Sequence, residues 1–523
     1  MNTLSERVVA LPAERLRGIR RGIEKESLRA EPDGRLALTP HPAPLGSPLT
    51  HPHITTDFSE SQPELVTGVH ASVDGALTEL TEIHQVVYQE MAALGDEMLW
   101  VSSMPCGLPT DETIPIGRYG GSNVGRAKSV YRMGLSHRYG RRMQTISGIH
   151  YNWSLPGVSS AQYFALIRNF RRNAVVVLYL FGASPAVCSS FVAGRDHELQ
   201  PLGERTMYLP HATSLRMGRL GYQSDAQASL AVSYNSLESY GGSLEEALTR
   251  PYPPYEAIGI QNPGGDYNQL ATTLLQIENE FYGTIRPKRV IGSGERPLHA
   301  LRERGVEYVE VRLMDLNPFE PVGIGASTMH FLDVFLMHCL LSPSAPDTLA
   351  EIDAMQANQQ LVASRGREPG LQLTRTDGQG VCQQVLLTDW AAELLAQMMP
   401  VAQRLDALQA GQDGPGEAAP AGVHSQAVAA ARAALADMSQ LPSARVLAAV
   451  NAREGQTFVG FIAARAQAIA TEFLAQPLSQ AEAQAFAAQA QQSVADQRAI
   501  EAADTLNFEA YRQQYTSPAG LVV

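Results

Sequence analysis

Residues 308–313 read Tyr308-Val309-Glu310-Val311-Arg312-Leu313, and this alternation of polar and apolar side chains decides the fold class. In a β-strand, residues i and i+2 point to the same face and lie about 6.6 Å apart. One face of this strand is apolar, and the other presents Glu310 beside Arg312. The strand predicted at 149–155 alternates in the same way, with His150, Asn152 and Ser154 opposite an apolar set. The two strands predict a sheet with one core face and one chemically active face.

Acidic residues occupy two further segments with strand-like character. Glu24 and Glu26 lie two residues apart in GIEKESLR, and Asp57 and Glu64 begin and end the stretch DFSESQPE. A single acid in a strand is more often solvated, and Lys25 and Ser27 interrupt the apolar side of the segment at Glu24. Carboxylates gathered on one face repel each other unless cations lie among them. The repetition predicts a hard-metal enzyme whose candidate ligands are Glu24, Glu26, Asp57, Glu64 and Glu310, with His150 as a nitrogen ligand.

The composition describes a soluble globular chain of 523 residues, of which 44% are hydrophobic and 18% charged. The net charge of −13 argues against nucleic acid or an anionic membrane as a partner. Glu6 and Arg7 stand where a signal peptide would have its apolar region, and the uncharged run 173–194 is interrupted at 182–185. We therefore expect a cytoplasmic protein without a membrane partner.

The four cysteines show no CxxC spacing, which fits a reducing compartment better than a disulfide scaffold. Cys106 is predicted to be a buried thiol, because no histidine or other base lies at a suggestive spacing from it. The sequence therefore contains no convincing protein nucleophile.

Helical spacing of apolar residues predicts long helices at 72–94, 160–181 and 327–341. Beyond residue 385 the composition shifts to Ala, Gln and Leu, and 479–503 is predicted to be a helical cover. We expect an α+β fold with a catalytic core at 1–385 and a helical region at 386–523, packed on the core or continuous with it. The stretch 410–423 is predicted to be a flexible loop.

Two basic loop regions suit small anionic ligands. In the Gly-rich stretch 119–140, backbone N–H groups would approach an anion while Lys128 and Arg132 neutralise it, although a plain turn into a charged helix is the stronger interpretation. Elsewhere Arg216 precedes Tyr222, and Tyr282 precedes Arg286. Such Arg/Tyr pairs suit recognition of an amino acid, although surface arginines with half-buried tyrosines are the more common explanation.

These motifs resemble, in the same order, those of the glutamate–cysteine ligase (γ-glutamylcysteine synthetase) family of the proteobacterial type. The resemblance covers residues 20–340 and rests on RGIEKESLR, SPLTHPHITTDFSESQPELVTG, SSMPCG, MQTISGIHYNWSLP, SLRMGRLGY, YGTIRPKR and VEYVEVRLMDLNPF. Several motifs in one order are specific, whereas the C-terminal third adds little. Pro63, directly before Glu64, is a small departure that could shift the start of that strand.

The resemblance implies a glutamine-synthetase-like fold, in which a curved, mainly antiparallel sheet forms a funnel and helices pack outside. It implies that the six candidate ligands bind Mg²⁺, with Mn²⁺ as a possible substitute. It also implies catalytic roles for Arg312 and Arg132, substrate binding by Tyr131, Arg216, Tyr222 and Tyr282, and nucleotide binding by Arg286, Lys288 and Lys128.

The implied reaction uses ATP to join the γ-carboxylate of L-glutamate to the amine of L-cysteine through a γ-glutamyl phosphate, the first step of glutathione biosynthesis. Arg312, beside Glu310, would stabilise the moving phosphoryl group. Three alternatives stay open: a ligase for another amine, a catalytically silent metal- or glutamate-binding protein on the same fold, and a metal-dependent phosphohydrolase. The expected partners are small-molecule substrates only, with the chain a monomer.

Overall fold

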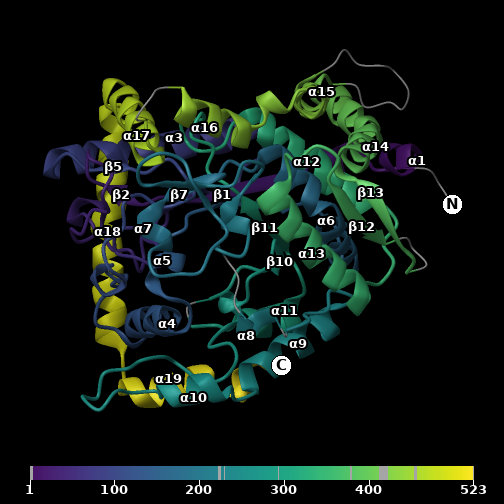
Figure 1. Cartoon of the computed structure of the whole chain (residues 1–523). Coiled ribbons are helices and arrows are strands. Elements are labelled where there is room, and N and C mark those ends of the chain that lie inside the picture. The colour runs from purple at the N-terminus through teal and green to yellow at the C-terminus, as the bar shows by residue number, and fades with distance from the viewer. Residues whose placement is uncertain are drawn as a thin grey trace.

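The computed structural model describes residues 4–221, 225–228, 230–292, 294–376, 380–411, 422–452 and 456–521. At its centre lies a six-stranded sheet in the order β10-β11-β6-β1-β4-β3, with every neighbouring pair antiparallel. The strands are β1 (Arg20–Glu26), β3 (Ile54–Thr56), β4 (Pro63–Val66), β6 (Ile149–Ser154), β10 (Ile285–Lys288) and β11 (Tyr308–Met314). Figure 1 shows the sheet in the interior of the molecule, surrounded by helices. Segments far apart in the chain are therefore neighbours in the sheet.

Three long helices cover the apolar face of this sheet: α3 (Val73–Leu94), α6 (Ser160–Phe181) and α12 (Ala326–Leu341). α6 contacts β10 and β11, α3 contacts β1 and β4, and α12 packs against both helices. Their bounds agree with the predicted helices to within one residue. Ser72 and Ser159 cap α3 and α6 by accepting hydrogen bonds from backbone N–H groups of the first turn. Local sequence signals thus account for the N-terminal ends of α3 and α6, whereas α12 begins after Gly325 without a side-chain cap.

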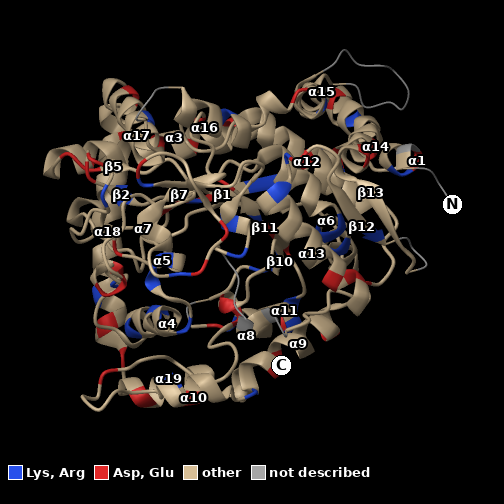
Figure 2. Cartoon of the chain, viewed as in Figure 1, with Lys and Arg blue, Asp and Glu red and all other residues tan. Residues whose placement is uncertain are grey.

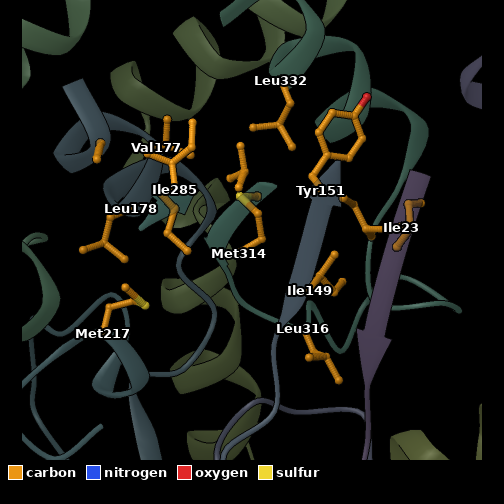
Figure 3. Packing of buried hydrophobic residues seen from close by; sticks show 14 of the residues in the cluster. Ile23, Ile149, Tyr151, Val177, Leu178, Met217, Ile285, Met314, Leu316 and Leu332 are labelled. Atoms are coloured by element: carbon orange, nitrogen blue, oxygen red, sulfur yellow. The ribbon is translucent and has the colours of Figure 1, made fainter. Parts of the chain in front are cut away.

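The core lies between the sheet and these helices. Ile23 of β1, Tyr151 of β6 and Ile285 of β10 are fully buried. Figure 3 shows them beside Val177 of α6 and Leu332 of α12. Because strand side chains alternate between faces, burial of this set turns the intervening residues to the opposite side. The predicted division into an apolar and a polar face is therefore confirmed.

The other helices before residue 370 are connected by long loops. They are α1 (Leu4–Val9), α2 (Ala13–Arg17), α4 (Asn123–Tyr139), α5 (Arg141–Gln144), α7 (Ser189–Val192), α8 (Asp225–Ala228), α9 (Leu237–Thr249), α10 (Pro253–Ile258), α11 (Pro297–Arg304) and α13 (Leu349–Arg365). Two small sheets join β2 (Arg29–Ala30) to β5 (Met98–Leu99), and β7 (Ala186–Cys188) to β9 (Thr206–Tyr208) and β8 (Gln200–Pro201). The uncharged run 173–194 thus contains the end of the buried helix α6 and, after the interruption predicted at 182–185, the strand β7 and the short helix α7.

The described chain is helical beyond a two-stranded sheet of β12 (Gln372–Thr376) and β13 (Cys382–Leu386). The helices are α14 (Leu387–Gln409), α15 (Val423–Ala436), α16 (Pro442–Asn451), α17 (Phe458–Ala475), α18 (Gln480–Ala503) and α19 (Phe508–Thr516). α14 and α15 pack on α12, α17 on α3, and α19 on α4; α18 runs along one side of the molecule (Figure 1). The helical cover predicted at 479–503 is confirmed. Most of the loop predicted at 410–423 lies outside the described residues, and the domain division at 385 stays a prediction.

Among the described helices, α17 is long and apolar enough to cross a membrane by length and composition. It contacts α3, β5 and β7, and 44% of it is buried inside the protein. A core helix with this composition passes the same test, so this finding alone does not indicate a membrane span.

The cysteines are all unpaired, with Cys106, Cys188 and Cys339 buried and Cys382 exposed. Burial raises the pKa of the Cys106 thiol, which keeps it protonated near neutral pH. The prediction of a buried thiol at this position is confirmed.

Candidate active site

The register of the sheet brings the predicted acids together on its polar face. Glu24 of β1 pairs with His150 of β6, and Glu26 pairs with Glu64 of β4. On the other side of β6, Asn152 pairs with Glu310 of β11. β4 begins at Pro63, so Glu64 occupies a regular strand position despite the preceding proline. We call Glu24, Glu26, Asp57, Glu64, His150 and Glu310 the acid cluster.

Direct contacts tie the centre of the acid cluster together. His150 lies with Nδ1 3.1 Å from Oε2 of Glu24 and with Nε2 3.6 Å from Oε1 of Glu26. Ligand atoms of Glu24, Glu64 and His150 all lie within 4.8 Å of one another. The backbone N–H of Gly148 donates to Glu26 at 2.7 Å. Carboxylate oxygens with one imidazole, converging from three strands, form a donor set that a divalent cation can bridge.

Two members of the acid cluster, Glu26 and Glu64, lie close to other carboxylates that nearby basic side chains do not fully balance. Burial, reinforced by the neighbouring carboxylates of Asp57 and Glu64, raises the pKa of Glu26 well above its ordinary value. Burial and the carboxylates of Glu24 and Asp57 raise the pKa of Glu64 to about 8. Both acids therefore tend to hold a proton when no cation is bound. A divalent ion would relieve this repulsion, so the residues present fit a metal.

Glu310 lies in a different environment, because basic side chains surround it. Arg312 donates to it at 2.9 Å and Nζ of Lys288 lies 3.1 Å away. Although burial opposes ionisation, Lys288 and Arg312 hold the pKa of Glu310 well below its usual range. Figure 2 shows acidic and basic positions together along β1, β10 and β11. This end of the acid cluster is therefore neutralised within the protein.

Helix α4 supplies two further predicted residues. Arg132 donates through Nε to the backbone carbonyl of Asp57, and Nη2 lies 3.3 Å from the carbonyl of Thr56. Lys128 and Arg132 both lie over the ring of Tyr119. Burial and the charge of Arg132 lower the pKa of Lys128 to about 8, against the opposing effect of Glu64. Both cations thus lie at the Asp57 and Glu64 side of the acid cluster.

The Gly-rich loop before α4 does bind anions, but they belong to this chain. The N–H of Gly121 donates to Glu501 at 2.8 Å, and the N–H of Asn123 donates to Asp504 at 2.5 Å. Glu501 lies in the last turn of α18, and Asp504 is the residue directly after this helix. No local pattern in the sequence places the end of α18 beside this loop. The loop therefore anchors the C-terminal region, and the plain turn into a charged helix was the better interpretation.

A pocket of about 480 Å³ adjoins the acid cluster. Arg216, Tyr282 and Arg312 line it, and Val175 of α6 and Met355 of α13 contribute to its apolar side. The guanidinium of Arg216 is buried: Nη2 donates to the carbonyl of Arg312 at 2.7 Å, and Nη1 lies 3.6 Å from Asp315. Arg216 is thus engaged with the strand that carries Arg312.

The other predicted substrate- and nucleotide-binding residues differ in their hydrogen bonds and electrostatic neighbours. Tyr282 accepts a hydrogen bond from Gln144 at 2.7 Å, and burial raises its pKa. Burial and Glu280 raise the pKa of Tyr131, whose electrostatic neighbours include Tyr282. Nη2 of Arg286 donates to the backbone carbonyls of Asn279 and Phe281, so its guanidinium holds the segment 279–281 in place. Tyr222 lies outside the described residues.

Asn152 also belongs to the site, although the sequence motifs did not select it as a ligand or a substrate-binding residue. Its Nδ2 donates to Glu24 at 2.9 Å, and its Oδ1 is buried without a hydrogen-bond partner among the described residues. The signal was present, because the alternation that selected His150 places Asn152 on the same face. An amide that donates to a candidate ligand orients the carboxylate beside it.

Comparison with known proteins gives one family. The sequence model of the glutamate–cysteine ligase family matches residues 9–362. The glutamate–cysteine ligase of Hahella chejuensis is 47% identical over 96% of each chain, and that of Alcanivorax borkumensis is 44% identical over 98% of this chain and 99% of its own. A solved glutamate–cysteine ligase from Francisella tularensis, in complex with AMP, matches with a TM-score of 0.87 and 37% identity, covering 95% of this chain and 97% of its own.

A second solved structure, a bifunctional glutathione synthetase from Pasteurella multocida, matches with a TM-score of 0.68 at 24% identity. The match covers 91% of this chain and 57% of the synthetase chain. At 24% identity the likeness shows the fold alone. The all-antiparallel central sheet and these structural matches confirm the expected α+β fold.

Proposed function

The chain belongs to the glutamate–cysteine ligase family, and from this premise we propose that it joins the γ-carboxylate of L-glutamate to the amine of L-cysteine, with ATP as co-substrate and Mg²⁺ as cofactor. The products are γ-glutamylcysteine, ADP and phosphate. The observation that supports the metal requirement is the convergence of Glu24, Glu64 and His150, whose ligand atoms lie within 4.8 Å of one another, with Glu26 opposite Glu64 in the neighbouring strand.

The chemistry explains why the nucleotide is needed. A carboxylate is a poor acyl donor because its leaving group would be oxide, whereas a γ-glutamyl phosphate releases phosphate when the amine attacks. No protein nucleophile takes part, in agreement with the buried, protonated state of Cys106. The chain's task is to position the reactants and stabilise charge.

We assign metal binding to the acid cluster, with Glu24, Glu64 and His150 as the most closely grouped ligands. These residues would hold Mg²⁺, which would supply positive charge to offset that of the phosphates, and the same oxygen-rich donors suit Mn²⁺. Asn152 would hold the Glu24 carboxylate in orientation through its 2.9 Å hydrogen bond.

Arg312 is the proposed stabiliser of the moving phosphoryl group. Its guanidinium stays charged because Glu310 raises its pKa despite burial, and it lies on the pocket wall beside the acid cluster. Lys288 and Arg132 provide further positive charge near the two ends of the cluster. Arg286 and Lys128 keep their proposed nucleotide-binding roles.

Substrate recognition is proposed for the pocket that Arg216 and Tyr282 line. Since the Arg216 guanidinium is turned toward the Arg312 carbonyl and Asp315, we assign it first to holding Arg312 in place. Tyr131, Tyr222 and Tyr282 are proposed to close around the amino acid substrates.

One assay tests the reaction. ADP release is measured with glutamate alone and then with L-cysteine, L-alanine or ethylamine added, with Mg²⁺ or with chelator. We expect ADP release that requires Mg²⁺, glutamate and cysteine together, with γ-glutamylcysteine as the product. ADP release without any amine would favour a phosphohydrolase, a preference for alanine or ethylamine would favour another acceptor, and no turnover would favour a binding protein.

A further inference from the structure

We propose that His330, Asp333 and His424 form a second metal site, of the zinc type, on the side of the sheet opposite the acid cluster. We call these three residues the rear histidine cluster. His330 and Asp333 lie one turn apart on α12, and His424 lies in the first turn of α15. This inference does not depend on the proposed ligase reaction, because none of the three residues belongs to the acid cluster or lines the pocket beside it.

The side chains of the rear histidine cluster converge on one point. One ligand atom from each residue lies within 4.8 Å of the others. The two imidazole rings meet edge to face, with centroids 4.8 Å apart. Zinc–nitrogen bonds are about 2.0–2.1 Å long, so small side-chain rotations would bring these atoms to ligand distance.

The second nitrogen of His424 is oriented by a carboxylate, as in many metal-ligating histidines. Nδ1 of His424 lies 2.9 Å from Asp406, which also accepts from the backbone N–H groups of Gly422, His424 and Ser425. These bonds hold the Asp406 carboxylate in place and ionised. A proton on Nδ1 leaves Nε2 as a lone-pair donor.

His330 also carries an unmet polar group. Among the described residues, its Nδ1 is buried and has no hydrogen-bond partner. A buried polar atom without a partner costs free energy, and a bound cation would satisfy it. The ring as a whole is half-buried, so ions can reach it from solvent.

Asp333 can serve as the third ligand although it already has two partners. Arg21 donates to both of its oxygens, at 3.4 and 2.8 Å, and the Tyr151 hydroxyl donates to Oδ1 at 2.8 Å. Oδ2 thus receives one of these bonds and keeps a second lone pair. The Arg21 charge lowers the affinity for a cation but also fixes the carboxylate in position.

The donor set indicates the class of metal. Two imidazoles and one carboxylate suit Zn²⁺, Co²⁺ or Ni²⁺, whereas Mg²⁺ prefers oxygen ligands and several waters. Three protein ligands leave one tetrahedral position for water. Mg²⁺ should therefore occupy the acid cluster without displacing a metal from the rear histidine cluster.

The test uses the full-length chain, stripped of metal and then held in excess Mg²⁺ to fill the acid cluster. Zn²⁺ bound per chain is measured after gel filtration, and its affinity by competition with a chelating dye. We expect one tightly bound Zn²⁺ per chain in the wild type. His330→Gln and His424→Gln should each weaken binding at least tenfold, and Asp406→Asn about tenfold through loss of the orienting charge.

His299→Gln is the matched control, because it removes the histidine of a separate, partly exposed group formed with Glu295 and Glu303. It should leave the bound Zn²⁺ unchanged. Mg²⁺-dependent turnover without zinc checks that each variant is folded. If a variant does not fold, Co²⁺ titration of the wild type gives an independent result, since a four-coordinate nitrogen/oxygen site produces visible absorption. Zn²⁺ affinity unchanged in both histidine variants, or no Zn²⁺ or Co²⁺ binding by the wild type in Mg²⁺, would overturn the proposal.

Discussion

The two faces of the central sheet both carry buried charge, but they treat it differently. On the core face, Arg21 of β1 pairs with Asp333 at 2.8 Å, and Nζ of Lys25 lies 2.8 Å from Nε2 of His84. On the polar face, Glu26 and Glu64 lie opposite each other in neighbouring strands. On the core face, Arg21 is met by a carboxylate and Lys25 by the imidazole of His84, whereas this part of the polar face places two acids opposite each other.

This difference separates structural from functional charge. A buried ion pair that the protein completes by itself contributes to the fold, and loss of one partner is costly. Repelling carboxylates are tolerated only where something from outside the chain neutralises them.

The largest expected effect on stability comes from the core face. Arg21→Met leaves the Asp333 carboxylate buried without its cation, and we expect the free energy of unfolding to fall by about 3–5 kcal/mol. Urea denaturation measures the change. The double variant Arg21→Met/Asp333→Leu should recover most of the loss, because it removes both charges. Equal loss in the single and double variants would contradict a completed ion pair.

The next largest effect is on turnover, from the polar face. Glu26→Gln removes a proposed ligand, and we expect turnover to fall by about 100-fold or more and the Mg²⁺ requirement to rise. Mutation of residues that only orient metal ligands already lowers metal affinity or activity by about 10–100-fold. Steady-state kinetics over a range of Mg²⁺ measures both. Glu14→Gln, at an exposed position outside the sheet, is the control. Wild-type Mg²⁺ dependence in Glu26→Gln would exclude ligation by this residue.

A smaller effect is a pH dependence of stability in the metal-free protein. Glu64 has a pKa of about 8 in the folded chain and an ordinary value of 4.5. The folded state therefore binds more protons between these values, so the free energy of unfolding should fall as pH rises from 4.5 to 8. Each such carboxyl contributes up to about 1.4 kcal/mol per pH unit, and Glu26 acts in the same direction.

Urea denaturation with chelator and with Mg²⁺ measures this slope. Mg²⁺ should make the free energy of unfolding nearly independent of pH, because the ion takes the place of the protons on Glu26 and Glu64. In the metal-free protein, Glu64→Gln should reduce the dependence on pH. If the free energy of unfolding of the metal-free protein does not change between pH 4.5 and 8, the raised pKa of the two acids is contradicted.

The smallest effect has the opposite sign and comes from the core face. Burial lowers the pKa of Lys25 from 10.5 to about 7. The unfolded state therefore binds more protons between pH 7 and 10.5, so the free energy of unfolding should rise with pH there, by up to about 1.4 kcal/mol per pH unit. The measurement is made in Mg²⁺ to suppress the carboxylates. Lys25→Met should remove the rise, and its persistence in that variant would assign it to another group.

Lys25 also shows how far local patterns extend. The alternation in the sequence places this lysine on the otherwise apolar side of β1, and in the structure it is buried there. Its partner, His84 of α3, is 59 residues away, and no local pattern connects the two. The Gly-rich loop is a second example, because its anions Glu501 and Asp504 come from the opposite end of the chain.

By itself, the sequence determined which side chains share a face and where the main helices begin and end. These properties depend on the two-residue repeat of strands and on capping within one turn, so Glu310 and Arg312, or Ser72 before α3, are visible locally. Only the tertiary structure decided which strands are neighbours, and therefore that Glu24, Glu64 and His150 meet while Lys25 and Arg21 find partners behind them. Strand order and the environment of each charge depend on contacts between distant segments, which alternation along one strand does not encode.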